Sequence, residues 1–146
     1  MDDTRNAAYA ALLLRVSLGI LFLAHGLMKV FVFTVPGTVQ FFESIGYPGF
    51  FAYLVILGEV GGGLLLILGA WTRVVALALV PILVGATLQH AGNGWVFSGQ
   101  GGGWEFPAFW TVCLLAQALL GAGAFALNPA RVLGAAPSAR VAGAAR

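Results

Sequence analysis

The sequence contains four apolar runs, each about as long as the hydrocarbon core of a membrane is thick. An α-helix rises 1.5 Å per residue, so about 20 apolar residues are needed to cross roughly 30 Å of lipid. The runs cover residues 8–32, 50–70, 72–91 and 105–127. They predict an all-α integral membrane protein in which four transmembrane helices form an antiparallel bundle.

The composition excludes a soluble globular domain. Apolar residues make up 60% of the chain and charged residues 8%, against roughly a quarter charged in soluble domains. Too few polar groups remain to cover a surface that faces water, so the lipid bilayer is the expected surrounding. The net charge of +2 is too small to favour nucleic acid as a partner. The single cysteine, Cys113, excludes an internal disulfide, and no metal site is expected.

We expect a single transmembrane domain over residues 1–127. The residues that follow, 128–146, are mainly alanine, glycine and arginine and have no apolar period. A segment of this composition cannot bury enough apolar surface to fold by itself. We therefore expect a disordered cytoplasmic tail.

The connections between the runs differ in length. Residues 69–73 are few enough to require a tight antiparallel hairpin between the second and third runs. Within residues 33–49, the stretch 38–45 has apolar and polar residues on opposite sides, which predicts a short interfacial helix that ends at Gly46. Residues 90–104 are rich in glycine and contain two tryptophans, so we expect a mobile lid that is anchored at the lipid headgroups.

The basic residues near the ends of the runs are unevenly distributed. One side of the membrane would have Lys29, and the other would have Arg5, Arg15, Arg73, Arg131, Arg140 and Arg146. The positive-inside rule then predicts that both termini lie in the cytoplasm, and we expect a multi-pass protein of the inner (plasma) membrane. The outer side collects aromatic residues that we expect to form an interfacial belt: Phe41, Phe42, Tyr47, Phe50, Phe51, Trp95, Trp104 and Trp110.

The first run has one polar face. On a helical wheel, an arc of about 120° holds Arg15, Gly19, Phe22, His25, Gly26 and Lys29. A charge at membrane depth costs on the order of 3 kcal/mol, so this face should point towards the other helices.

Glu59 is the expected partner of this polar face, because it is the acidic residue in the middle of the second run. One interpretation is a structural ion pair with Arg15 or Lys29, with Arg15 the preferred partner, that makes insertion of the charges tolerable. The other makes Glu59 a catalytic proton acceptor beside a bound small molecule, with His25 as a second catalytic group. The two interpretations are compatible.

His90 ends the third run, and Glu105 begins the fourth. Together with His25 and Lys29 they should lie at a similar depth, where they would form a polar pocket that opens outwards over an apolar floor. We assign substrate binding to Lys29, His90 and Glu105. The expected ligand is a lipid quinone, whose oxygens would be held by lysine and histidine while Glu59 or Glu105 moves protons.

Haem is an alternative ligand, because His25 and His90 would face each other diagonally in a bundle. Two histidines near helix ends more often form interface hydrogen bonds, and there is no CxxCH attachment motif. We therefore expect neither haem nor any covalently bound cofactor.

Several short motifs, taken together, resemble the DoxX family. They are Leu14-Arg-Val-Ser-Leu-Gly19, His25-Gly-Leu-Met-Lys29, Gly58-Glu-Val-Gly-Gly62, Leu68-Gly-Ala-Trp-Thr-Arg73, and His90 ahead of Trp104-Glu105. The resemblance extends nearly to residue 127. It implies a small bacterial integral membrane protein of four helices, related to the DoxD-type subunit of thiosulfate:quinone oxidoreductase. It also implies family positions at Arg15, His25, Lys29, Glu59, Arg73, His90 and Glu105.

The resemblance favours a quinone-interacting membrane subunit of a redox complex linked to thiosulfate, thiols or oxidative stress. Such a subunit requires a soluble or membrane redox partner that donates electrons, and whether the chain is itself an enzyme stays open. A second hypothesis is a scaffold without enzymatic activity, in which the charges stabilise the helices while the tail or the glycine-rich loop recruits partner proteins. A third is a small-molecule transporter, which would require a homo-oligomer.

Overall fold

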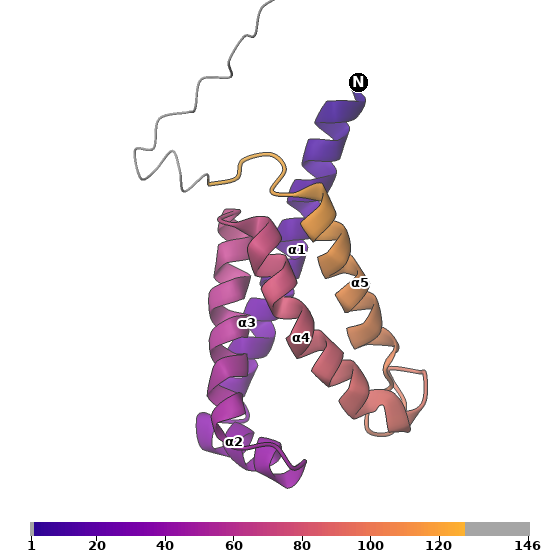
Figure 1. Ribbon diagram of the computed structural model, residues 1–146. Coiled ribbons are helices and arrows are strands. Elements are labelled where there is room, and N and C mark those ends of the chain that lie inside the picture. The colour runs from indigo at the N-terminus through magenta and orange to yellow at the C-terminus, as the bar shows by residue number, and fades with distance from the viewer. Residues whose placement is uncertain (1, 128–146) are drawn as a thin grey trace, which may run out of the picture.

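A computed structural model describes residues 2–127, and within this range every regular element is helical. The elements are α1 (Asp3–Phe31), α2 (Val35–Ser44), α3 (Phe50–Leu68), α4 (Thr72–His90), the 3₁₀ turn η1 (Ala91–Asn93) and α5 (Glu105–Leu120). Four long helices run up and down beside one another, and α2 lies across one end (Figure 1). The all-α prediction is confirmed for these residues, whereas the predicted tail 128–146 lies outside them.

Three of the helices are long and apolar enough to cross a membrane: α1, α3, and α4 continued through η1. The apolar helix α5 has 16 residues and so rises about 24 Å, less than a typical hydrocarbon core. It ends at Leu120, short of the expected end at residue 127, because Gly121 takes a φ of +83° that a helix cannot continue.

Glycines bring the backbones of α1 and α3 into close contact. A Cβ atom on Gly63 would lie 2.7 Å from the amide nitrogen of Leu23 and 2.8 Å from the carbonyl oxygen of Gly19. Two turns along α1, a Cβ atom on Gly26 would lie 2.6 Å from a methyl group of Val60. Helices without a hydrophobic driving force between them pack through small residues in this way. The contacts fix the register of α1 against α3.

The other face of α3 packs against α4. Gly58 and Gly62 leave room for the side chains of Ile82 and Leu79, as expected for a pair of small residues one turn apart. The core that joins all four long helices is apolar and includes Leu18, Phe22, Leu66, Leu79, Leu83, Trp110 and Leu114.

The two longer connections lie at the same end of the molecule. Figure 1 places α2 and the loop between η1 and α5 at the end opposite the N-terminus. A helix is observed where one was predicted over 38–45, but α2 begins three residues earlier, at Val35, and Gly46 follows it with a φ of +88°. Its position at the membrane interface stays a prediction. The short hairpin between α3 and α4 is also as predicted, because Gly69 ends α3 in the left-handed conformation and α4 begins at Thr72.

Residues 121–127 form a non-helical segment that turns back across α1 and α3. The amide of Ala124 donates to the carbonyl of Ala8 at 3.0 Å, and the amide of Leu127 donates to the carbonyl of Leu68 at 3.0 Å. This segment therefore joins α5 to the N-terminal half of α1 and to the end of α3.

Candidate functional site

Lys29 and Glu59 form an ion pair between α1 and α3. The lysine Nζ lies 2.7 Å from one carboxylate oxygen and 2.9 Å from the other, and the side chains are 19% and 6% exposed. Glu59 lies midway along α3, and its Cβ lies 3.0 Å from the point where Gly26 would carry one. A side chain on a helix leans towards the N-terminus of that helix, so Lys29 reaches back from the end of α1 to this depth. The pair is thus set within the helix packing.

Arg15 does not pair with Glu59, and the preferred form of the predicted ion pair is wrong. Its side chain is 1% exposed, and its guanidinium donates to the carbonyls of Leu66 at 3.0 Å, Ile67 at 2.8 Å and Ala124 at 3.1 Å. Carbonyls in the last turn of a helix lack intrahelical donors and carry partial negative charge. Arg15 therefore caps the end of α3 and fastens the 121–127 segment, and Lys29 is the partner of Glu59.

Arg73 has a similar structural position at the end of α5. Its guanidinium donates to the carbonyl of Ala118 at 2.8 Å, and Gly121 lies against the same group. Like Arg15, Arg73 donates to the backbone at a helix C-terminus, and no carboxylate among residues 2–127 pairs with it.

His25 is half-buried and precedes Gly26, whose Cβ position lies against the Cβ of Glu59. Its Nδ1 donates to the carbonyl of Leu21 at 2.8 Å, which leaves Nε2 as the ring atom available to a ligand. The ring meets Trp110 of α5 edge-on, with the centroids 4.9 Å apart. Trp110 also packs against Phe22 at 4.6 Å and Phe106 at 5.4 Å.

His90 and Glu105 hold the loop between η1 and α5. Nδ1 of His90 lies 3.0 Å from the carbonyl oxygen of Gly102, and the Glu105 carboxylate accepts a hydrogen bond from the amide of Phe97 at 2.8 Å. The Glu105 amide in turn donates to the carbonyl of Trp95 at 3.2 Å. The predicted lid is therefore tied to the helices at both of its ends.

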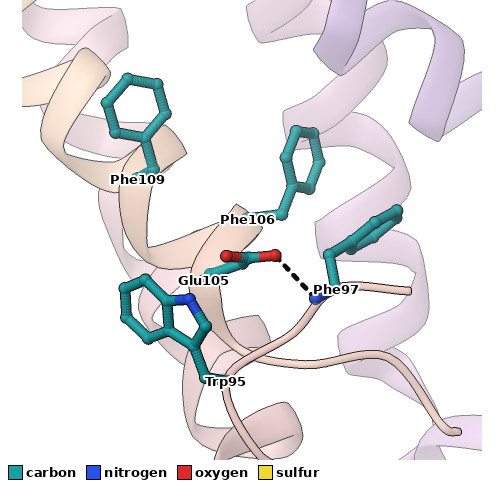
Figure 2. Close-up of a pocket in the computed structure, with 5 residues that line it drawn as sticks. All are labelled: Trp95, Phe97, Glu105, Phe106 and Phe109. Carbon is teal, nitrogen blue, oxygen red and sulfur yellow. Dashed lines mark hydrogen bonds between the residues drawn. The ribbon is translucent and has the colours of Figure 1, made fainter. Parts of the chain in front are cut away.

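A pocket of about 470 Å³ lies where this loop meets α5. It is lined by four aromatic side chains and one carboxylate: Trp95, Phe97, Glu105, Phe106 and Phe109. Figure 2 shows the rings arranged around the Glu105 carboxylate, which points to the amide of Phe97.

The structure does not bring His25, Lys29, His90 and Glu105 together as one polar group. His25 and Lys29 accompany Glu59 between the helices, whereas His90 binds the loop and Glu105 lines the pocket. Within residues 2–127 no hydrogen bond or ion pair joins the two groups. They are connected through packed aromatic rings instead, because Trp110 contacts both His25 and Phe106.

The prediction that Trp110 belongs to the aromatic belt at the membrane interface is wrong. Its side chain is 5% exposed, and its indole N–H has no hydrogen-bond partner among the described residues. The sequence does contain a signal for this position, since Phe106, Trp110, Leu114 and Gln117 recur at helical spacing and all lie on the inward face of α5. Gln117, which is fully buried, belongs to the same spacing and is a second inward-facing residue that the prediction missed.

These features define a class of protein: a multi-pass membrane protein whose helices enclose a half-buried group of titratable side chains. The model of the DoxX family matches residues 10–92, a range that contains α3 and the Lys29–Glu59 pair. The chain belongs to the DoxX family, as its motifs predicted, and it is a multi-pass protein of the inner membrane. The pocket residues 95–109 lie beyond the matched range.

Two curated proteins are similar to parts of the chain. One, named "Putative oxidoreductase CatD", from Bacillus subtilis (strain 168), is 46% identical over 77 residues, which are 53% of this chain and 56% of that protein. The other, named "Inner membrane protein YqjF", from Escherichia coli (strain K12), is 44% identical over 66 residues, 45% of this chain and 49% of that protein. The chain thus spans about half the length of the curated relatives it matches. No solved structure gives a significant match.

Proposed function

We propose that this protein is the quinone-binding membrane subunit of a redox complex, with the ligand held at His25, Lys29 and Glu59. The observation that carries the proposal is the buried Lys29–Glu59 pair midway along α3, with the free Nε2 of a half-buried histidine beside it. A lipid quinone dissolves at this depth and carries two oxygens that need hydrogen-bond partners. The oxidoreductase name of the Bacillus subtilis relative adds support.

The two α1 side chains suit the oxygens of a quinone. His25 and Lys29 are four residues apart, so they lie on the same face of α1. An ammonium group has three protons, and Glu59 accepts two hydrogen bonds from Lys29, which leaves one donor for a carbonyl oxygen. Because Nδ1 of His25 is already bonded, Nε2 accepts from a quinol hydroxyl when the ring is neutral and donates to a quinone when it is protonated.

Glu59 completes the proton chemistry. Reduction of a quinone to a quinol adds two electrons and two protons, and oxidation releases them. The electrons pass to or from a soluble or membrane redox partner, which the proposal requires. In this proposal one proton moves between the bound ring and Glu59 through Lys29, the second moves through Nε2 of His25, and both are finally exchanged with water.

We also propose that the N-terminal end of α1 faces the cytoplasm. Arg5, Arg15 and Arg73 lie towards that end, whereas Lys29 lies towards the end that carries α2. The test uses a Cys113→Ala background with one added cysteine, Tyr47→Cys or Trp71→Cys. A thiol reagent that cannot cross membranes should label the first in intact cells and the second only after permeabilisation. The reverse pattern contradicts the orientation.

The proposed ligand is tested by measuring quinone per mole of protein, by mass spectrometry of solvent extracts after purification in dodecyl maltoside. We expect near-stoichiometric quinone in the wild type and in Glu43→Gln, a matched control on the exposed side of α2. His25→Ala and the charge-free pair Lys29→Met/Glu59→Gln should lose it while eluting as folded protein. The double substitution leaves no unpaired buried charge, so it keeps the test separate from stability.

The proposal would be overturned if wild-type protein purified from quinone-rich membranes contained only traces of quinone. The scaffold hypothesis would then be the better account, with the ion pair serving only to hold α1 against α3. Equal quinone in all four proteins would contradict the assignment to these residues and place the ligand elsewhere.

A further inference from the structure

The residues of the aromatic pocket between the loop and α5 take no part in the proposed quinone site. Four of its five lining residues are aromatic, and the fifth, Glu105, is the one charged side chain among them. Figure 2 shows Trp95 and Phe109 on one side of the carboxylate and Phe97 and Phe106 on the other. An occupant of this space would therefore meet ring faces or edges around a negative charge.

The carboxylate itself has unused hydrogen-bonding capacity. Oε1 of Glu105 accepts from the amide of Phe97 at 2.8 Å, and no donor reaches Oε2 from the described part of the chain. An anion would be repelled here, and a neutral ring would leave Oε2 without a donor after displacing water from it. An organic cation balances the charge of the carboxylate and is attracted by the surrounding rings, whether or not it carries an N–H group.

The walls of the pocket hold one another in place. The rings of Phe97 and Phe106 have centroids 5.1 Å apart, and Trp95 meets Trp104 edge-on at 4.6 Å. The amide of Glu105 donates to the carbonyl of Trp95, so the loop wall is tied to the first turn of α5. A site whose walls are fixed before binding loses less entropy when a ligand enters.

We infer that this pocket binds an organic ammonium group, held by the Glu105 carboxylate within the rings of Trp95, Phe97, Phe106 and Phe109. Aromatic rings around a cation, with a carboxylate to balance the charge, are the arrangement that recognises alkylammonium ligands. The volume of about 470 Å³ admits an ammonium group with its attached chain. That chemistry occurs in the ethanolamine headgroup of a lipid and in free amines, and the pocket lies at the end of α5 where a helix would meet the headgroups.

The test compares choline with 3,3-dimethylbutan-1-ol, in which a neutral carbon replaces the quaternary nitrogen. Both are titrated into the full chain in dodecyl maltoside at constant ionic strength, and binding is followed by saturation-transfer difference NMR. We expect choline to bind at least about tenfold more tightly than the neutral analogue. This comparison needs no substitution, so a variant that fails to fold cannot confuse it.

Two substitutions then assign the binding to the pocket. Glu105→Gln should weaken choline about tenfold, and Phe109→Leu, which keeps an apolar side chain but removes the ring, about three- to tenfold. The matched controls are Glu43→Gln and Phe31→Leu, an exposed carboxylate and an exposed ring outside the pocket, which should bind choline as the wild type does.

The source of the ammonium group is tested in nanodiscs of phosphatidylethanolamine or of an uncharged glycolipid, which has no ammonium group and does not concentrate choline at the bilayer surface as an anionic lipid would. Weaker choline binding in the ethanolamine lipid identifies the lipid headgroup as the occupant, and equal binding in both lipids identifies a free amine. Equal affinity for choline and its neutral analogue, or unchanged choline binding in Glu105→Gln, would overturn the inference. Neither result would bear on the quinone measurement, which concerns other residues.

Discussion

Removing one partner of the Lys29–Glu59 pair should destabilise the protein by an amount that depends on which charge is left. Lys29→Met leaves a carboxylate that is 6% exposed and has lost both of its hydrogen bonds from Nζ. Unpaired buried charges of this kind cost about 3–5 kcal/mol. Glu59→Gln leaves a lysine that is 19% exposed, and its long side chain can extend towards the membrane surface. We expect a smaller loss there, about 1–2 kcal/mol.

The double variant Lys29→Met/Glu59→Gln shows what removing both charges does to stability, in contrast to removing one of them. With neither charge present, no buried charge is left alone, and we expect stability within about 1 kcal/mol of the wild type. The free energy of unfolding is measured by titrating dodecyl sulfate into mixed micelles and following helix content by circular dichroism. A double variant as unstable as Lys29→Met, or a Lys29→Met protein as stable as the wild type, would refute the argument that the pair compensates two buried charges.

Two further predictions concern the helix contacts. Gly63→Ala should destabilise the protein by about 1–3 kcal/mol in the same titration, because its Cβ would meet the backbone of α1, whereas Gly61→Ala, with nothing within 4 Å of its Cβ position, should cost little. A Gly61→Ala protein as unstable as Gly63→Ala would contradict this packing. Arg15→Met removes the donor to the carbonyl of Ala124, one of the hydrogen bonds that hold the 121–127 segment, so limited proteolysis should cut this segment faster than in the wild type. Equal cutting rates would show that other contacts secure it.

Hydropathy alone was enough to predict the spans, because membrane thickness fixes how many apolar residues a helix needs. The ends of α3 and α4 and the C-terminal end of α1 fall close to the predicted ones for this reason, whereas α1 begins at Asp3 and not at residue 8, because Asp2 caps a polar first turn that hydropathy does not detect. The end of α5 does not, since the apolar residues after Leu120 gave no sign that Gly121 would turn the chain back over α1. Composition cannot separate an apolar helix from an apolar segment that packs without helical structure.

The partner of Glu59 could not be read from residue types, because either cation of α1 could have paired with it. The choice depends on the register between α1 and α3, which is set by the contact of Gly19 with Gly63. That register places Arg15 level with Ile67, eight residues along α3 from Glu59 and so about 12 Å away in helix rise. The ion pair could have been predicted by placing the glycine-rich faces of α1 and α3 against each other before choosing a partner for Glu59.

Register therefore sorts the membrane-depth charges into two kinds. Arg15 and Arg73 are bound through their terminal guanidinium nitrogens to carbonyls at the ends of α3 and α5, while Nε of Arg15 is buried and has no partner among the described residues. Lys29, which binds Glu59, keeps one ammonium proton for a further acceptor, and His25 keeps Nε2 without a partner among the described residues. The structural interpretation of the intramembrane charges thus applies to the arginines. The proposed quinone site uses residues of α1 and α3 alone. Replacing its ion pair with two neutral residues leaves no unpaired buried charge, so a loss of quinone in that variant can be distinguished from a loss of folding.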